Sequence, residues 1–151
     1  MSDHLINLVK HQFFTSKKWC LVIGDLMLDQ YIFGDVERIS PEAPVPVIKK
    51  NKLLNRIGGA GNVALNLLGL GIKPILVGNI GNDNNGKILS SLLKEHNLST
   101  KGLIKENRAT TTKTRIMAGH HQIARIDEEQ ISVSPSEISI KKIIKHINSD
   151  P

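Results

Sequence analysis

A glycine-rich stretch, Ile57-Gly58-Gly59-Ala60-Gly61-Asn62-Val63-Ala64, constrains the fold of this chain more than any other segment. It places three glycines and an alanine within four positions, so a ligand can approach its backbone closely. Apolar residues then recur at helical spacing at Val63, Leu67 and Leu70, which predicts that a helix begins in this stretch. The unpaired N–H groups of a helix start favour anions or hydroxyl-rich ligands. A tight turn that only caps the helix is the alternative interpretation.

The composition is that of one globular domain or part of one. The 151 residues are 40% hydrophobic and only 3% aromatic, so Ile, Leu and Val must build the core. The net charge of +6 permits an anionic partner, but the Lys and Arg residues are scattered and lack interleaved aromatic residues, which argues against nucleic acid. One cysteine, Cys20, excludes a disulfide framework and a Cys-based zinc site. We expect a cytoplasmic protein, because neither a membrane span nor a signal peptide is evident.

The apolar runs predict an α/β sheet. Residues Trp19 to Gly24 are almost continuously apolar, which predicts a first strand that is buried on both faces. A helix at about 62–70, ended by Gly71, and a strand over 73–78 follow, in strand–helix–strand order. Asp83 to Gly86 predicts a turn with a helix cap, then a helix to about Asn97 and a short strand over 101–105.

Two carboxylates, Asp25 and Asp29, come just past the end of the first strand. Ligands of open α/β sheets bind at that edge, where a carboxylate can accept hydrogen bonds from sugar hydroxyls or hold a metal. Capping of a turn is the alternative for either residue.

The next segment, 38–48, holds three prolines in six residues, at positions 41, 44 and 46. Proline excludes helix and cannot donate to a sheet, so the segment is predicted to be extended and edge-like. It is either a flap over a site or a surface hairpin without function.

Residues 110–127 are predicted to form a β-hairpin with its turn at Gly119-His120, because β-branched and polar residues alternate there. Lys113 and Arg115 share one face of the first strand, and Arg125 and Asp127 share one face of the second. Solvated charge on an exposed sheet is the alternative to a binding face. Helices are also predicted near each end, over residues 3–14 and from Ser134, the latter with a core-facing stripe at Ile140, Ile143, Ile144 and Ile147.

Several familiar chemistries do not fit. Residues 59–64 match the dinucleotide pattern G-x-G-x-x-A, but residues 52–56 before it lack a β-branched run, so no strand is expected there and nicotinamide binding is disfavoured. No P-loop lysine follows the glycines. Neither a metal-ligand cluster nor a nucleophile elbow for Ser/His/Asp catalysis is evident.

Four motifs in order resemble the ribokinase-like (PfkB-type) carbohydrate kinases, and among them the kinase domain of bacterial D-glycero-β-D-manno-heptose 7-phosphate kinases, which is often fused to an adenylyltransferase. The resemblance covers about 19–127 and rests on residues 22–31, 38–47, 58–66 and the pair of segments 112–116 and 122–127. It implies a doubly wound α/β sheet with a small β-lid, of which only the N-terminal half is present. Residues 1–18 would then be an N-terminal extension and 19–151 the N-terminal part of the kinase domain, with lid segments at about 30–50 and 110–127.

The resemblance also implies roles for particular residues. Asp29 corresponds to the acceptor of sugar hydroxyls, Gly58 and Gly59 bring backbone against the sugar, and Asn62 hydrogen-bonds it. A phosphorylated sugar needs a basic contact, for which the candidates are Lys113, Arg115 and Arg125. The implied reaction transfers a phosphoryl group from Mg-ATP to the anomeric hydroxyl, in ADP-heptose and lipopolysaccharide core precursor synthesis.

The family's G-A-G-D motif, which supplies the catalytic aspartate, does not occur in the 151 residues. The ATP-binding loops belong to the same missing part. We therefore expect a sugar-binding half of a heptose 7-phosphate kinase that neither binds ATP nor acts as an enzyme by itself. The alternative is a non-catalytic sugar-binding module or the partner of a separately encoded C-terminal half. The resemblance further suggests homodimers through the lid.

Overall fold

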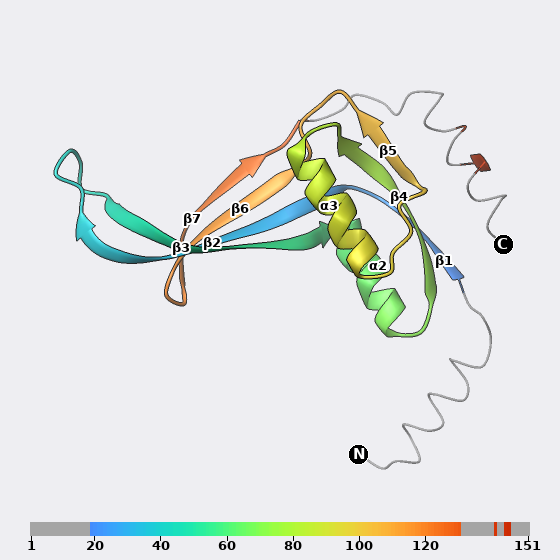
Figure 1. The fold of residues 1–151 in the computed structure, drawn as a ribbon, viewed down its shortest axis with the longest axis horizontal. Helices are drawn as coiled ribbons and strands as arrows, with labels where there is room; N and C mark the ends of the chain where they lie inside the picture. Colours follow the sequence, from blue (N-terminus) through green and yellow to red (C-terminus); the bar gives the residue numbers. More distant parts are fainter. Residues whose placement is uncertain (1–18, 131–140, 142–143, 146–151) are drawn as a thin grey trace, which may run out of the picture.

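The computed structural model describes residues 19–130 together with residues 141, 144 and 145. Over this part of the chain the elements form two sheets and two helices (Figure 1). In chain order they are β1 (Trp19–Ile23), β2 (Leu26–Ile39), β3 (Pro46–Gly59), α2 (Ala60–Gly69), β4 (Lys73–Gly81), α3 (Asn84–Glu95), β5 (Leu103–Glu106), β6 (Thr112–Ala118) and β7 (His121–Glu128).

The first sheet is parallel, with the strand order β1-β4-β5, and both helices lie against one of its faces (Figure 1). The strand–helix–strand prediction is therefore confirmed. The core lies between this sheet, the start of β2, the end of β3 and the two helices. Its most buried members are aliphatic, as the low aromatic content requires: Val22, Leu26, Leu28, Ile57, Ala64, Leu76, Ile80, Leu89, Leu93 and Leu98.

The second sheet, called the outer sheet here, has the order β3-β2-β6-β7 and projects away from the helices (Figure 1). Its β2–β3 and β6–β7 pairs are antiparallel, and β2 and β6 pair in parallel. The predicted 110–127 hairpin is confirmed, with its turn at Gly119-His120. The proline-rich segment forms the turn between β2 and β3, and β3 is an edge strand. Both segments expected to form a lid thus lie in the outer sheet.

Two predicted helix boundaries, the end of α2 and the start of α3, are confirmed by their caps. At the end of α2, Gly71 adopts φ 77° and donates to the Leu68 carbonyl, while Ile72 donates to the Leu67 carbonyl. These two bonds satisfy carbonyls that would otherwise be unpaired at a helix end. At the start of α3, the Asp83 carboxylate accepts from the Gly86 N–H at 2.8 Å.

Three sequence predictions about the strands and α2 were wrong. The strand β1 is not buried on both faces, because Trp19 and Ile23 are 53% and 62% exposed and, in the described residues, β1 pairs only with β4. Residues 52–56 do form a strand, as part of β3, held by pairing with β2 rather than by a buried face. On α2, Val63 and Leu70 are exposed. The helix begins two residues earlier than predicted, and its inner face follows Ala64 and, in part, Ala60, Leu65, Leu67 and Leu68.

The predicted helix over 3–14 and most of the helix from Ser134 lie outside the described residues. Within that second helix, Ile144 is exposed, so its predicted core-facing position is wrong. Among the residues that the structure describes, no helix is long and apolar enough to cross a membrane.

Candidate functional site

The parallel sheet β1-β4-β5 and the helices α2 and α3 are called the α/β layer here. The glycine-rich stretch connects β3 of the outer sheet to α2 of this layer. Gly59 adopts φ 57°, a conformation that side chains other than glycine rarely take, and a Cβ there would collide with the Asp25 carbonyl. That carbonyl accepts a hydrogen bond from the Ala60 N–H at 2.9 Å. No side chain caps the first turn of α2. The turn is therefore compact, and the N–H groups of the helix start have no side-chain acceptor.

A strand does precede the glycines, so the expected absence of a strand does not exclude dinucleotide binding. The kind of sheet to which this strand belongs does argue against it. In a dinucleotide-binding unit the preceding strand belongs to the parallel sheet. Here that strand is β3, which pairs antiparallel with β2 in the outer sheet.

Asp29 lies within β2, not in a loop, and it stands directly beside the glycine stretch. A Cβ on Gly58 would lie 2.7 Å from the Asp29 Oδ2 atom. The absence of a side chain at position 58 thus leaves room for this carboxylate. Asp25, the other predicted candidate, is exposed at the bend between β1 and β2, where its carbonyl holds the turn.

Strand register brings charged residues into two rows on one face of the outer sheet. The first row crosses β3, β2, β6 and β7 through Arg56, Asp29, Lys113 and Asp127. The second crosses the same strands through Leu54, Tyr31, Arg115 and Arg125. Residues paired across neighbouring strands project to the same side of a sheet. The buried Leu26 and Leu28 alternate with Asp29 along β2, so the charged face is opposite the face that joins the core.

An ion pair joins the two rows. The Arg115 Nη1 atom donates to the Asp29 Oδ1 atom at 2.7 Å, and the two side chains are 24% and 21% exposed. This hydrogen bond raises the pKa of Arg115 above its ordinary value, more than burial lowers it. The guanidinium also lies 5.3 Å from the centre of the Tyr31 ring. Position 115 therefore presents a fixed cation beside the predicted sugar-binding carboxylate.

Two residues of this face were not predicted from the sequence. Arg56 lies 5.2 Å from the centre of the same Tyr31 ring, so one aromatic side chain carries a guanidinium contact from β3 and another from β6. The signal was the alternation of residues 54, 56 and 58 with the opposing 27, 29 and 31. This alternation indicates a shared face only if residues 52–56 are known to form a strand.

The remaining predicted residues lie around this pair. Lys113 stands between Asp29 and Asp127 in its row. Arg125 forms an ion pair with Asp127 at 2.8 Å and is about half exposed. Asn62 is exposed in the first turn of α2, next to the glycines. The structure thus brings Asp29, Gly58 and Arg115 together and surrounds them with the other candidates.

A partly buried hydrogen-bonded cluster fixes the outer sheet to the α/β layer at the start of β6. The Asp83 carboxylate accepts from the Thr110 hydroxyl at 2.6 Å and from the Thr110 N–H at 2.9 Å. Thr110 Oγ1 in turn accepts from the Gly81 N–H at 2.9 Å, and Asn85 donates to Thr112 at 3.0 Å. Burial favours the neutral acid, but the hydrogen bonds that the carboxylate accepts from Thr110 and Gly86 outweigh it and lower the pKa of Asp83. The cluster sets the position from which β6 carries Lys113 and Arg115.

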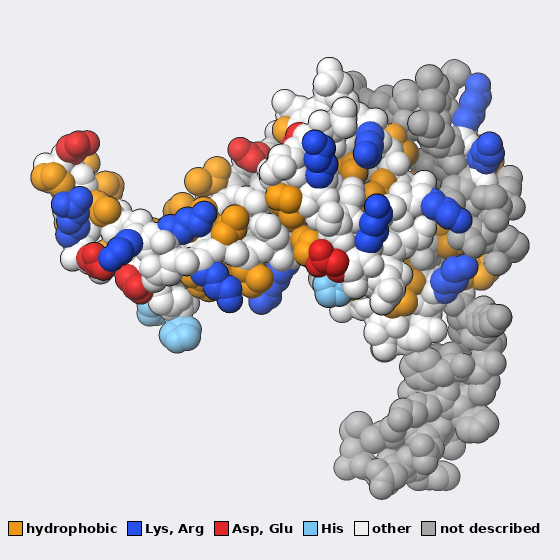
Figure 2. All heavy atoms as spheres, in the orientation of Figure 1, with side chains coloured by type: hydrophobic (Ala, Val, Ile, Leu, Met, Phe, Trp, Pro, Cys, Tyr) orange, Lys and Arg blue, Asp and Glu red, His pale blue; other side chains and the backbone are white. Residues whose placement is uncertain are grey.

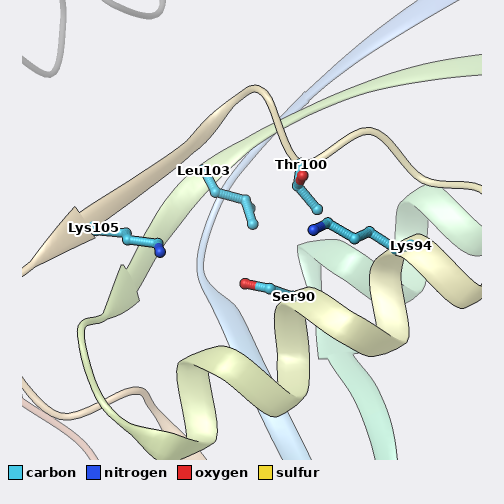
Figure 3. Close-up of a pocket in the computed structure, with 5 residues that line it drawn as sticks. All are labelled: Ser90, Lys94, Thr100, Leu103 and Lys105. Atoms are coloured by element: carbon cyan, nitrogen blue, oxygen red, sulfur yellow. The ribbon is translucent and has the colours of Figure 1, made fainter.

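A separate hollow of about 310 Å³ lies between α3 and the segment around β5, lined by Ser90, Lys94, Thr100, Leu103 and Lys105 (Figure 3). It contains none of the predicted site residues, and both lysines are exposed. Figure 2 shows that most charged side chains on the helical face of the molecule are Lys or Arg. The hollow is therefore one basic part of a basic surface, distinct from the charged face of the outer sheet.

The chain is similar to known proteins over most of its length. Residues 17–143 match the model of the pfkB family of carbohydrate kinases. The bifunctional protein HldE of Methylobacillus flagellatus is 45% identical over 138 residues, which cover 91% of this chain and 28% of that protein. HldE of Magnetococcus marinus is 50% identical over 114 residues, which cover 75% and 23%. The chain thus spans about a quarter of the length of these relatives.

Solved structures confirm the fold. A putative sugar kinase from Clostridium perfringens superposes with a TM-score of 0.63 at 18% identity, over 86% of this chain and 40% of that one. Ribokinase from Cryptococcus neoformans, solved in complex with ADP, gives 0.54 at 21% identity, over 78% and 37%. The predicted ribokinase-like α/β fold, present in part, is therefore confirmed. Because the model of the pfkB family of carbohydrate kinases matches most of the length of this chain, the chain belongs to that family.

Proposed function

We propose that this chain is the sugar-binding part of a heptose 7-phosphate kinase. The complete reaction would transfer the γ-phosphoryl group of Mg-ATP to the anomeric hydroxyl of the sugar, releasing ADP and a proton, in the synthesis of ADP-heptose for lipopolysaccharide. The likeness to two HldE proteins at 45% and 50% identity supports this substrate class.

The observation that carries the proposal is the position of Asp29, which touches both the glycine stretch and Arg115. A sugar phosphate needs an acceptor for hydroxyl groups, a surface without side chains and a cation for its phosphate. Asp29, Gly58 and Arg115 supply these three features within one set of contacts. In this proposal the sugar lies over Gly58 and Gly59, and the outer sheet covers it as a lid.

The residues present here supply binding and not phosphoryl transfer. Phosphoryl transfer requires both the phosphate donor and the attacking hydroxyl to be positioned. The G-A-G-D motif of the family does not occur in the sequence. We therefore propose that ATP is the co-substrate of the whole enzyme and that these 151 residues alone do not turn it over. Phosphorylation of the heptose phosphate by the purified chain and ATP would overturn this part of the proposal.

Calorimetric titration of the chain with D-glycero-D-manno-heptose 7-phosphate tests the sugar site. We expect saturable binding, weakened at least tenfold in Asp29→Asn, because hydrogen bonds to a charged acceptor contribute about 1.5–3 kcal/mol. The matched control is Asp127→Asn, which makes the same charge change in the same row but at the edge strand β7, where we expect a smaller loss. The absence of binding, or equal affinities for the natural chain and Asp29→Asn, would refute the proposal.

A further inference from the structure

We infer that the ion pair between Arg115 and Asp29 makes recognition of the sugar depend on the phosphate that the sugar carries. The phosphate draws Arg115 away from Asp29 and so frees a carboxylate oxygen for the sugar hydroxyls. The inference rests on the function proposed above and assigns to Arg115 the selection of phosphorylated over neutral sugars.

The two oxygens of Asp29 have different surroundings. Oδ2 lies against the backbone of Gly58, 2.7 Å from where a Cβ of that residue would be, beside the place proposed for the sugar. Oδ1 accepts the 2.7 Å hydrogen bond from Arg115. A carboxylate that receives two neighbouring hydroxyls in a bidentate manner uses both oxygens, and the Arg115 bond occupies one of the two lone-pair positions of Oδ1 in this structure. A neutral sugar has no group that competes for a guanidinium as strongly as this carboxylate does.

The strand register gathers the cations that would receive the phosphate. Arg115 stands directly opposite Arg125 across the β6–β7 pair, and Arg125 pairs with Asp127 at 2.8 Å. Arg56 adds a third cation at the ring of Tyr31. A phosphate among these groups offers Arg115 a doubly charged partner. Asp29 alone offers a single charge.

A different role for the same ion pair is that Arg115 permanently orients Asp29 and stays paired when the sugar binds. The two roles predict opposite results for a neutral sugar. If Arg115 blocks the carboxylate, its removal strengthens neutral-sugar binding. If Arg115 orients the carboxylate, its removal weakens the binding of every sugar.

The experiment compares heptose 7-phosphate with unphosphorylated heptose on the natural chain and on Arg115→Met, by NMR titration. For Arg115→Met we expect the phosphorylated sugar to bind about tenfold or more weakly, since a charge-assisted contact is lost. We expect the neutral sugar to bind about fivefold more tightly, the upper range for release of a partly exposed ion pair. Arg56→Met is the matched control, because it removes a guanidinium from the same ring and leaves the Asp29 pair intact. It should weaken the phosphorylated sugar without strengthening the neutral one.

A reciprocal measurement does not depend on the fold of Arg115→Met. Inorganic phosphate should bind Asp29→Asn about fivefold more tightly than the natural chain, because Arg115 is then unpaired. Unchanged or weaker binding of neutral heptose to a folded Arg115→Met, or unchanged phosphate binding to Asp29→Asn, overturns the inference. If the natural chain binds heptose 7-phosphate in that case, the proposed function stands and only the inference fails. If it binds neither sugar, both are refuted.

Discussion

The α/β layer and the outer sheet are built by different means, although the start of β2, a strand of the outer sheet, packs into the core of the layer. In the α/β layer, the start of β2 and the helices bury aliphatic side chains completely, as at Leu26, Leu28 and Leu89. In the outer sheet, β7 is exposed along its whole length and much of β3 is also exposed. Backbone pairing and charged side chains hold that sheet. Stability is therefore concentrated in the layer, and the groups suited to ligand binding are concentrated in the outer sheet.

The largest expected effect is on the stability of the layer. Leu89→Ala removes a fully buried side chain of α3 and should lower the free energy of unfolding by about 2–5 kcal/mol. Ile126→Ala in β7, where the side chain is 52% exposed, should change it by about 0.5 kcal/mol. Urea denaturation of both variants measures the contrast. Equal losses would show that the outer sheet carries a core of its own.

The junction between the two regions should respond next. Asp83→Asn weakens the cap of α3 and the bonds to Thr110, and should cost about 1–3 kcal/mol of unfolding free energy. Asp35→Asn, at an exposed carboxylate that accepts from Asn51, is the matched control and should cost less.

The same junction predicts a dependence on pH. Because the folded pKa of Asp83 lies below its ordinary value of 3.8, its contribution to stability is complete above that value and is lost as the pH falls through the folded pKa. Asp83→Asn should therefore show a smaller loss of stability between neutral and strongly acidic pH, measured by denaturation at several pH values. An identical acid dependence in both proteins would contradict the role assigned to this carboxylate.

A smaller effect is expected at the glycine stretch, and on binding more than on folding. Gly58→Ala would place a Cβ 2.7 Å from the Asp29 carboxylate and from Met27, and should weaken heptose 7-phosphate binding about tenfold, or about 1.4 kcal/mol. Gly69→Ala, at the end of α2, meets no atom within 4 Å and should leave binding unchanged. If Gly58→Ala binds as tightly as Gly69→Ala, the carboxylate and the glycine do not share a ligand.

The same contrast explains how much the sequence could predict. The layer was largely predictable, because β4 is buried on both faces and reads as a continuous apolar run, while α3 buries one face and its apolar residues follow the helical period. The edge strand β3 was missed at Lys52 to Arg56, because neither of its faces there is buried and its structure comes from pairing with β2. The predicted stripe of α2 failed at Val63 and Leu70, because apolar residues occur around most of this helix and their spacing alone does not show that Ala64 and Leu68 face the core.

The candidate site was predictable residue by residue but not as an arrangement. The types of Asp29, Arg115 and Gly58 indicated their chemistry. The contact between Asp29 and Arg115 depends on the parallel pairing of β2 with β6, which joins residues 86 positions apart and has no local signal in the sequence. The closeness of Asp29 to Gly58 depends on the pairing of β2 with β3. Arg56 and Tyr31 were missed for the same reason, since their shared contact exists only after β3 is placed beside β2.

The most direct test of the central claim is an NMR map of backbone amide shifts during titration with heptose 7-phosphate. If the substrate lies between the glycine stretch and the charged face of the outer sheet, the largest changes should occur at Asp29, Gly58, Gly59 and Arg115. The hollow between α3 and β5, which contains Lys94, should remain unchanged. Largest changes at that hollow, or no changes at Asp29 and the glycines at saturation, would contradict the account.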